Sequence, residues 1–175
     1  MDIKLLVMDV DGTLTDGKIY MSAGGELMKA FNIKDGYAIT RLKEYGIEPA
    51  IITGRKSDIV KQRCVELKIT ELHQGVENKL FKLKDICAKK GITLSQVAYI
   101  GDDVNDLLCI QQCGVTACPA DAVKKVKLAV TMVTEAKGGD GAVREFCEYL
   151  VEKCGSSKDD EIADYEFSEI KFEEE

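Results

Sequence analysis

The chain has 175 residues, of which 24 are Lys or Arg and 31 are Asp or Glu, so its formal net charge is −7. This length allows one sizeable hydrophobic core, and a hydrophobic content of 45% excludes fibrous and wholly disordered proteins. Residues 158–175 contain nine acidic and two basic residues, so this segment alone accounts for the charge of −7. We therefore predict a balanced globular domain over residues 1–154 and a flexible acidic tail over 155–175. Because the domain has no basic patch, we expect no nucleic-acid partner.

The lengths of the apolar runs and the pattern of cysteines indicate the cellular compartment. Every apolar run is well short of the roughly 20 residues that a membrane-spanning helix needs, and residues 1–8 lack a signal-peptide pattern. The seven cysteines are odd in number and show no CxxC spacing, which disfavours a zinc site or a disulfide framework. We expect a soluble cytoplasmic protein with reduced core thiols and no membrane partner.

Short apolar, β-rich runs alternate along the chain with segments of helical periodicity. In chain order, we predict strands at 3–8, 48–53, 70–74, 97–101 and 115–118, and helices at 36–45, 57–67, 78–90, 104–112 and 141–153. Segments 18–21 and 27–32 flank a Ser-Ala-Gly-Gly turn and are typical of a β-hairpin. The alternation predicts an α/β fold with a doubly wound, Rossmann-like parallel sheet and a hairpin inserted after the first strand.

Three polar residues lie at or just past the ends of predicted strands: Asp9, Thr53 and Asp102. In doubly wound sheets the ligand binds beyond the carboxyl ends of the strands. We therefore expect these three side chains to meet at one site.

Residues 9–17 read Asp-Val-Asp-Gly-Thr-Leu-Thr-Asp-Gly and place two carboxylates where a buried strand opens into a glycine turn. A phosphate monoester resists attack because its oxygens are anionic, so its hydrolysis needs a positioned nucleophile, a cation and a proton donor. Asp9 is the candidate nucleophile, which would form an aspartyl-phosphate. Asp11 is the candidate acid, which would protonate the leaving oxygen and later activate water. The alternative is that Asp11 and Gly12 form a plain turn with a solvated acid.

Candidate phosphate ligands follow later in the chain. Thr53 and Gly54 can donate hydrogen bonds to phosphate oxygens, although Thr53 could instead cap the next helix. Lys79 begins a predicted helix and offers a positive charge to the same phosphate. Taken alone, Lys79 would be interpreted as a solvated helix residue.

A second group of acids follows the strand at 97–101 and contains Asp102, Asp103 and Asp106. Clustered carboxylates without a basic partner repel one another unless a hard cation lies among them. Oxygen ligands without histidine suit Mg²⁺, so the sequence predicts a magnesium site. The separate roles of Asp103 and Asp106 stay open.

In this order, Asp9 with Asp11, Thr53, Lys79 and Asp102 resemble the four motifs of the haloacid dehalogenase superfamily, in its phosphatase branch without a cap domain. Residues 28–36, 52–55, 74–75 and 138–146 are similar to the 3-deoxy-ulosonate phosphatases of that superfamily. The resemblance implies Mg²⁺ held by the carboxylates of Asp9 and Asp102 and the backbone carbonyl of Asp11. It also implies that Thr53 and Lys79 bind phosphate, and that the substrate is a small sugar-acid phosphate.

Spacing leaves no room for a cap domain over the site. Only 25 residues separate Thr53 from Lys79, and the 41 residues between Asp11 and Thr53 hold the hairpin, a helix and a strand. The site would be open unless another subunit covered it. Because the resembling phosphatases form tetramers through their hairpins, the resemblance implies a homotetramer whose active sites are shared between subunits.

A sugar-acid substrate carries a carboxylate, which requires a basic group beyond Lys79, and the candidates are Arg55 and Arg63. Arg63 lies about 12 Å along a helix from Arg55, so it should point away from its own phosphate site. The resemblance implies that Arg63 reaches the neighbouring subunit, and the alternative is a solvated helix residue. Arginine after Thr-Gly resembles enzymes that act on the eight-carbon 3-deoxy-D-manno-octulosonate 8-phosphate, whereas glutamate occurs in some nine-carbon enzymes.

Other functions remain open at this point. One is a nine-carbon ulosonate 9-phosphate phosphatase, and another is a non-catalytic regulatory homologue of the kind associated with sugar-acid cytidylyltransferases. A phosphosugar mutase is a third, although it usually needs a cap. Since the tail shares the substrate's negative charge, we expect truncation after Cys154 to leave turnover nearly unchanged.

Overall fold

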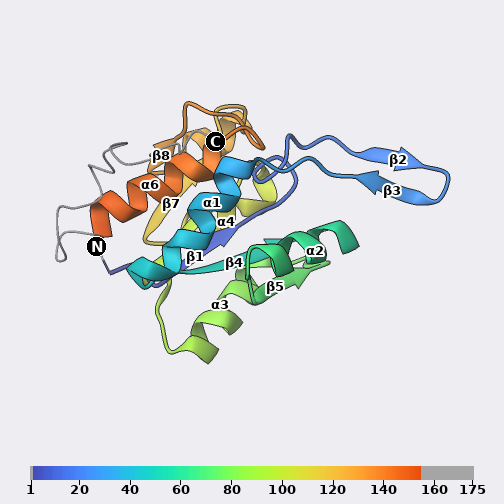
Figure 1. Ribbon diagram of the computed structural model, residues 1–175. Coiled ribbons are helices and arrows are strands. Elements are labelled where there is room, and N and C mark those ends of the chain that lie inside the picture. Colours follow the sequence, from blue (N-terminus) through green and yellow to red (C-terminus); the bar gives the residue numbers. More distant parts are fainter. Residues whose placement is uncertain (1, 155–175) are drawn as a thin grey trace, which may run out of the picture.

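The computed structural model describes residues 2–154 and places a six-stranded sheet at the centre of the molecule (Figure 1). The strand order is β5-β4-β1-β6-β7-β8, and every neighbouring pair is parallel. The strands are β1 Leu5–Met8, β4 Glu48–Thr53, β5 Glu71–Gln74, β6 Val97–Ile100, β7 Val115–Cys118 and β8 Met132–Val133. The five predicted sheet strands are thus confirmed, and β8 is a short edge strand that the sequence pattern missed.

Helices cover both faces of the sheet. They are α1 Ile33–Arg41, α2 Asp58–Glu66, α3 Lys79–Lys90, α4 Leu107–Ile110, α5 Lys124–Lys127 and α6 Ala142–Cys154, and 3₁₀ turns occur at Leu42–Tyr45, Leu94–Gln96 and Val104–Asp106. One hydrophobic core joins the sheet to α1, α2 and α6, and a second joins the opposite face to α3, α4 and α5. This arrangement confirms the predicted doubly wound α/β fold.

Side chains of β1 alternate between these two cores, which explains why its run is apolar without interruption. Leu6 and Met8 face the α1, α2 and α6 layer, whereas Leu5 and Val7 face the α3, α4 and α5 layer. β1 lies between β4 and β6, with Met8 paired to both Ile51 and Ile100. The residues that follow these three strands therefore emerge side by side at one edge of the sheet.

The hairpin predicted after the first strand is confirmed. β2 (Tyr20–Ser22) and β3 (Gly25–Met28) form a separate two-stranded antiparallel sheet, which projects away from the body of the domain (Figure 1). β3 begins directly after the turn with Gly25, whose φ of +114° is a conformation that favours glycine. Among residues 2–154 there is no inserted domain besides this hairpin.

Two further expectations concern the whole chain. All seven cysteines are free thiols, and five of them are buried. Within the described helices, none has the length and apolar character needed to cross a membrane. The acidic tail predicted for 155–175 lies outside the described residues.

Candidate active site

A pocket of about 200 Å³ opens at the carboxyl edge of the sheet. Its lining includes most of the predicted site residues, and the full set is Asp9, Asp11, Thr53, Gly54, Arg55, Asp102, Asp103 and Asn105. Asp9 and Thr53 are buried, whereas Asp11 and Asp102 are partly buried. The structure thus brings residues that lie far apart in the sequence to one cavity, because their strands are neighbours in the sheet.

Lys79 lies at the first position of α3, where the Asn78 side chain caps the helix. Instead of extending into solvent, its ammonium donates to Asp9 Oδ1 at 2.7 Å and to Asp106 Oδ1 at 2.8 Å. Burial by itself lowers the pKa of Lys79, but the charges of Asp9 and Asp106 outweigh it, so the net shift is upward. Lys79 therefore stays charged, and its ammonium has a third N–H that these two carboxylates do not use.

Asp106, whose role the sequence left open, is fully buried and satisfied by four donors. Its Oδ1 accepts from Lys79 and from the Tyr99 hydroxyl at 2.6 Å. Its Oδ2 accepts from the backbone N–H groups of Asp102 at 3.2 Å and Asp103 at 3.3 Å. Asp106 thereby ties the loop after β6 to Lys79, and its position is set by these contacts.

Asp9 and Asp102 form a pair of neighbouring acids in the same pocket. Burial raises the pKa of Asp9 to about 6 against the opposing effect of Lys79, and burial together with the nearby Asp9 and Asp106 charges raises that of Asp102 to about 7. Thr13 Oγ1 donates to Asp102 Oδ1 at 3.1 Å and so orients it. A Cβ at residue 12 would lie 2.1 Å from Asp102 Oδ2, which explains the glycine at that position.

The donor chemistry of this pair fits a hard divalent cation. Ligand oxygens of Asp9, Asp102 and Asp106 all lie within 4.8 Å of one another. Since the Asp106 oxygens already have four hydrogen-bond donors, Asp9 and Asp102 are the carboxylates free to bind a metal. A cation between them would offset the burial and the nearby negative charges that raise their pKa values.

The hairpin supplies a second network, which sequence reasoning missed. Lys29, just past β3, makes ion pairs with Asp11 Oδ1 and, at 3.2 Å, with Glu26 Oε1. Arg55 is 43% exposed and lies 3.7 Å from Asp11 Oδ2 and 3.8 Å from the same Glu26 oxygen. Glu26 also accepts a hydrogen bond from the hydroxyl of Ser57, and Ser57, not Thr53, caps α2. In the sequence, Lys29 stands out only as a member of the motif at residues 28–36. The spacing of that motif does not indicate what Lys29 contacts.

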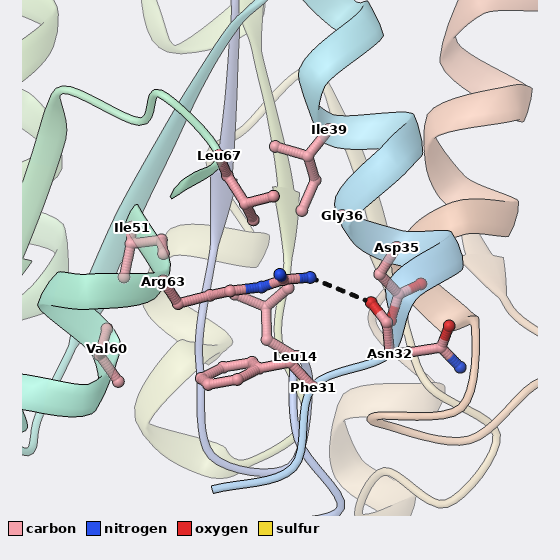
Figure 2. A pocket seen from close by; sticks show the side chains of 10 residues that line it. All are labelled: Leu14, Phe31, Asn32, Asp35, Gly36, Ile39, Ile51, Val60, Arg63 and Leu67. Carbon is pink, nitrogen blue, oxygen red and sulfur yellow. Dashed lines mark hydrogen bonds between the residues drawn. The ribbon is translucent and has the colours of Figure 1, made fainter. Parts of the chain in front are cut away.

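Arg63 does not line this pocket but a second, smaller one, which Figure 2 shows. Its side chain is 15% exposed and extends from α2 over a cavity of about 10 Å³, where it donates to the Asn32 carbonyl at 3.3 Å. The guanidinium also lies over the Phe31 ring, 5.6 Å from its centroid, and pairs with Glu66 at 2.8 Å. A Cβ at residue 36 would lie 2.4 Å from its Nη2, so Gly36 makes room for it. Arg63 thus points away from its own pocket, as its helical spacing indicated, and is not a solvated residue.

Comparison with known proteins agrees with this geometry. The haloacid dehalogenase-like hydrolase family matches residues 66–146, which include Lys79 and Asp102. The 3-deoxy-D-manno-octulosonate 8-phosphate phosphatase KdsC of Escherichia coli K12 is 46% identical over 150 residues, which cover 86% of this chain and 80% of the relative. The chain belongs to the 3-deoxy-D-manno-octulosonate 8-phosphate phosphatase family.

Solved structures of this phosphatase family share the fold. The crystal structure of the Yersinia pestis 3-deoxy-D-manno-octulosonate 8-phosphate phosphatase is 42% identical with a TM-score of 0.85, and the match covers 88% of this chain and 83% of that chain. The Moraxella catarrhalis phosphatase, solved in complex with magnesium ion, phosphate ion and a KDO molecule, is 42% identical with a TM-score of 0.84. That match covers 86% of this chain and 87% of the other. The superfamily and fold class expected from the motifs are therefore confirmed.

Proposed function

We propose that this protein is a Mg²⁺-dependent phosphatase that hydrolyses 3-deoxy-D-manno-octulosonate 8-phosphate. The observation that carries the proposal is the placement of Asp9: it is buried at the end of the central strand, held by Lys79 and facing a pocket that Asp11 also lines. Membership of the phosphatase family supports the same chemistry.

In the first step, a carboxylate oxygen of Asp9 attacks phosphorus and forms an aspartyl-phosphate. The bond between phosphorus and the sugar oxygen breaks, its electron pair passes to that oxygen, and Asp11 supplies the proton that makes the leaving group an alcohol. In the second step, water attacks the aspartyl-phosphate while Asp11 takes up a proton. Inorganic phosphate leaves and Asp9 is regenerated.

Groups around the same cavity would bind the phosphate. Thr53 and Gly54, which follow β4, line the pocket and would donate to phosphate oxygens. Lys79 would use its third N–H in the same way. Mg²⁺, when bound by the carboxylates of Asp9 and Asp102 and the backbone carbonyl of Asp11, supplies the positive charge that neutralises the transferring phosphoryl group.

Arg55 is our candidate for the substrate carboxylate. Among the described residues that line the pocket it is the one cation, and its guanidinium is weakly held, with carboxylate oxygens of Asp11 and Glu26 at 3.7 and 3.8 Å. A guanidinium can bind a carboxylate through two parallel hydrogen bonds, whereas the ammonium of a lysine acts as a point charge.

A phosphate-release assay with a panel of sugar phosphates tests the proposal. We expect Mg²⁺-dependent release from 3-deoxy-D-manno-octulosonate 8-phosphate, with the largest kcat/KM in the panel, and loss of release in excess chelator. A larger kcat/KM for a nine-carbon ulosonate 9-phosphate would correct the substrate. No turnover of any ester would favour the regulatory homologue, and an isomeric sugar phosphate formed without free phosphate would indicate a mutase.

A homotetramer with shared active sites is the second part of the proposal. Its support is the hairpin and its approach, which expose four large apolar side chains, namely Ile19, Met21, Leu27 and Met28. For Arg63 to bind substrate in a neighbouring subunit, it would have to exchange its contacts with Phe31 and Asn32 for the substrate. Light scattering gives the oligomeric state. Mixed oligomers of Asp9→Asn and Arg63→Ala chains should regain activity if the sites are shared, and no recovery in confirmed mixed oligomers would refute sharing.

A further inference from the structure

Lys29 is a buried cation that the proposed mechanism does not use. Its side chain is 2% exposed, although it lies at the base of a hairpin that otherwise projects into solvent. The ammonium contacts Asp11 Oδ1 and lies 3.2 Å from Glu26 Oε1. A lysine loses considerable rotamer freedom and hydration on burial, so these two carboxylates must compensate for that cost.

Lys29 contacts one of the two carboxylate oxygens of Asp11. Its ammonium occupies Oδ1, while Oδ2 lies on the side of Arg55, a residue that lines the pocket. The contact joins the base of the hairpin to the loop after β1, and it fixes a carboxylate that is itself 19% exposed. Without it, the Asp11 side chain could rotate about two torsions, and proton transfer is sensitive to such orientation.

We propose that Lys29 is a positioning residue for Asp11. By holding Oδ1, it directs Oδ2 toward the leaving-group oxygen, so that Oδ2 carries the proton that this oxygen receives when its bond to phosphorus breaks. Glu26 supports this role, because its ion pair with Lys29 holds the ammonium in place. This inference rests on the proposed phosphatase function, and it extends the reaction machinery to the inserted hairpin.

The role can be separated from a merely structural one by the dependence on the leaving group. A sugar alkoxide is a poor leaving group and needs the proton from Asp11, whereas p-nitrophenolate leaves without one. The constant kcat/KM reports only the steps up to the first irreversible one, here alcohol release, so the later hydrolysis of the aspartyl-phosphate does not mask the difference. Loss of Asp11 positioning should therefore affect the two esters unequally.

The experiment compares Lys29→Met with the parent on 3-deoxy-D-manno-octulosonate 8-phosphate and on p-nitrophenyl phosphate. We expect kcat/KM to fall by roughly 10-fold to 100-fold on the sugar ester and by less than about 3-fold on the aryl ester. The loss on the sugar ester is smaller than the full contribution of a general acid, because Asp11 is still present. Lys18→Met is the matched control, because Lys18 lies near the same hairpin, is 71% exposed and, among residues 2–154, forms an ion pair only with Asp16. It should leave both constants unchanged.

Equal losses on the two esters, or no loss on either, would overturn the positioning role. In an Asp11→Asn background the Lys29→Met change should have no further effect on the sugar ester, and a full additional loss there would also overturn it. If Lys29→Met does not fold, Glu26→Gln is tested in its place. Its kcat/KM should fall less than that of Lys29→Met, and again more on the sugar ester than on the aryl ester. A parent protein inactive on both esters would refute the proposed function itself, whereas an active parent with equal losses would refute this inference alone.

Discussion

The hydroxyl of Tyr99 offers a test of the buried network that holds Lys79. Tyr99 is fully buried on β6, and its hydroxyl donates to Asp106 Oδ1 at 2.6 Å, the same oxygen that accepts from Lys79. Tyr99→Phe removes this donor and keeps the ring, so it leaves the packing of the core unchanged. The change isolates one hydrogen bond to a buried carboxylate.

The expected loss follows from the geometry. A hydrogen bond to a charged group contributes about 1.5–3 kcal/mol, and three donors remain on Asp106 after the change, so we expect a loss near the middle of that range, about 2 kcal/mol. For a domain of this size, 1 kcal/mol corresponds to roughly 2–4 °C in Tm, which predicts a decrease of about 4–8 °C. Burial and the nearby Asp106 charge raise the pKa of Tyr99 well above its ordinary value, so the hydroxyl stays protonated and the bond persists throughout the neutral range.

Urea unfolding followed by circular dichroism at pH 7 measures the difference in free energy of unfolding. Tyr37→Phe is the control, because Tyr37 is 57% exposed and its ring contacts to Arg41 and Arg144 survive the change. It should change the free energy of unfolding by less than about 0.5 kcal/mol. A Tyr99→Phe protein as stable as the parent would show that Asp106 does not depend on this donor.

Three further predictions concern the acids of the site and of the core. Asp9→Asn should reduce turnover at least about 10⁴-fold while the protein stays folded, since an amide cannot form the acyl-phosphate, and substantial phosphate release by the folded variant would refute the covalent mechanism. Excess Mg²⁺ at 100 times its Kd should stabilise the parent by about 2.7 kcal/mol in thermal unfolding but not Asp102→Ala, and equal stabilisation of both would exclude Asp102 as a ligand. Burial raises the pKa of Asp35 from 3.8 to about 6, so the proton bound in the folded state contributes stability that is fully present below pH 3.8 and lost as the pH rises through 6, by about 3 kcal/mol in total. The stability of the parent relative to Asp35→Asn, measured by urea unfolding, should therefore decrease mainly between pH 4 and 6, and a constant difference would show that Asp35 does not titrate in this way.

Local sequence patterns were sufficient to predict most of the helices and strands. The run at β1 is apolar because both faces of a central parallel strand are buried, and this property is visible in the sequence without any knowledge of partners. Short elements were harder: α5 and β8 have four and two residues, and such lengths carry too little periodicity to distinguish them from loops.

For the site, the sequence by itself determined which residues end the strands. Asp9, Thr53 and Asp102 could be grouped because parallel strands direct their carboxyl ends to one edge, a rule that needs only the order of elements. Only the tertiary structure decided that Lys29 reaches Asp11 from the hairpin and that Asp106 holds Lys79. The two residues of each contact lie far apart in the chain, and no helical or strand periodicity relates them. The contacts depend on how loops fold over one another, so no local sequence pattern encodes them. A buried charge needs a partner, but which partner it finds is set by three-dimensional packing.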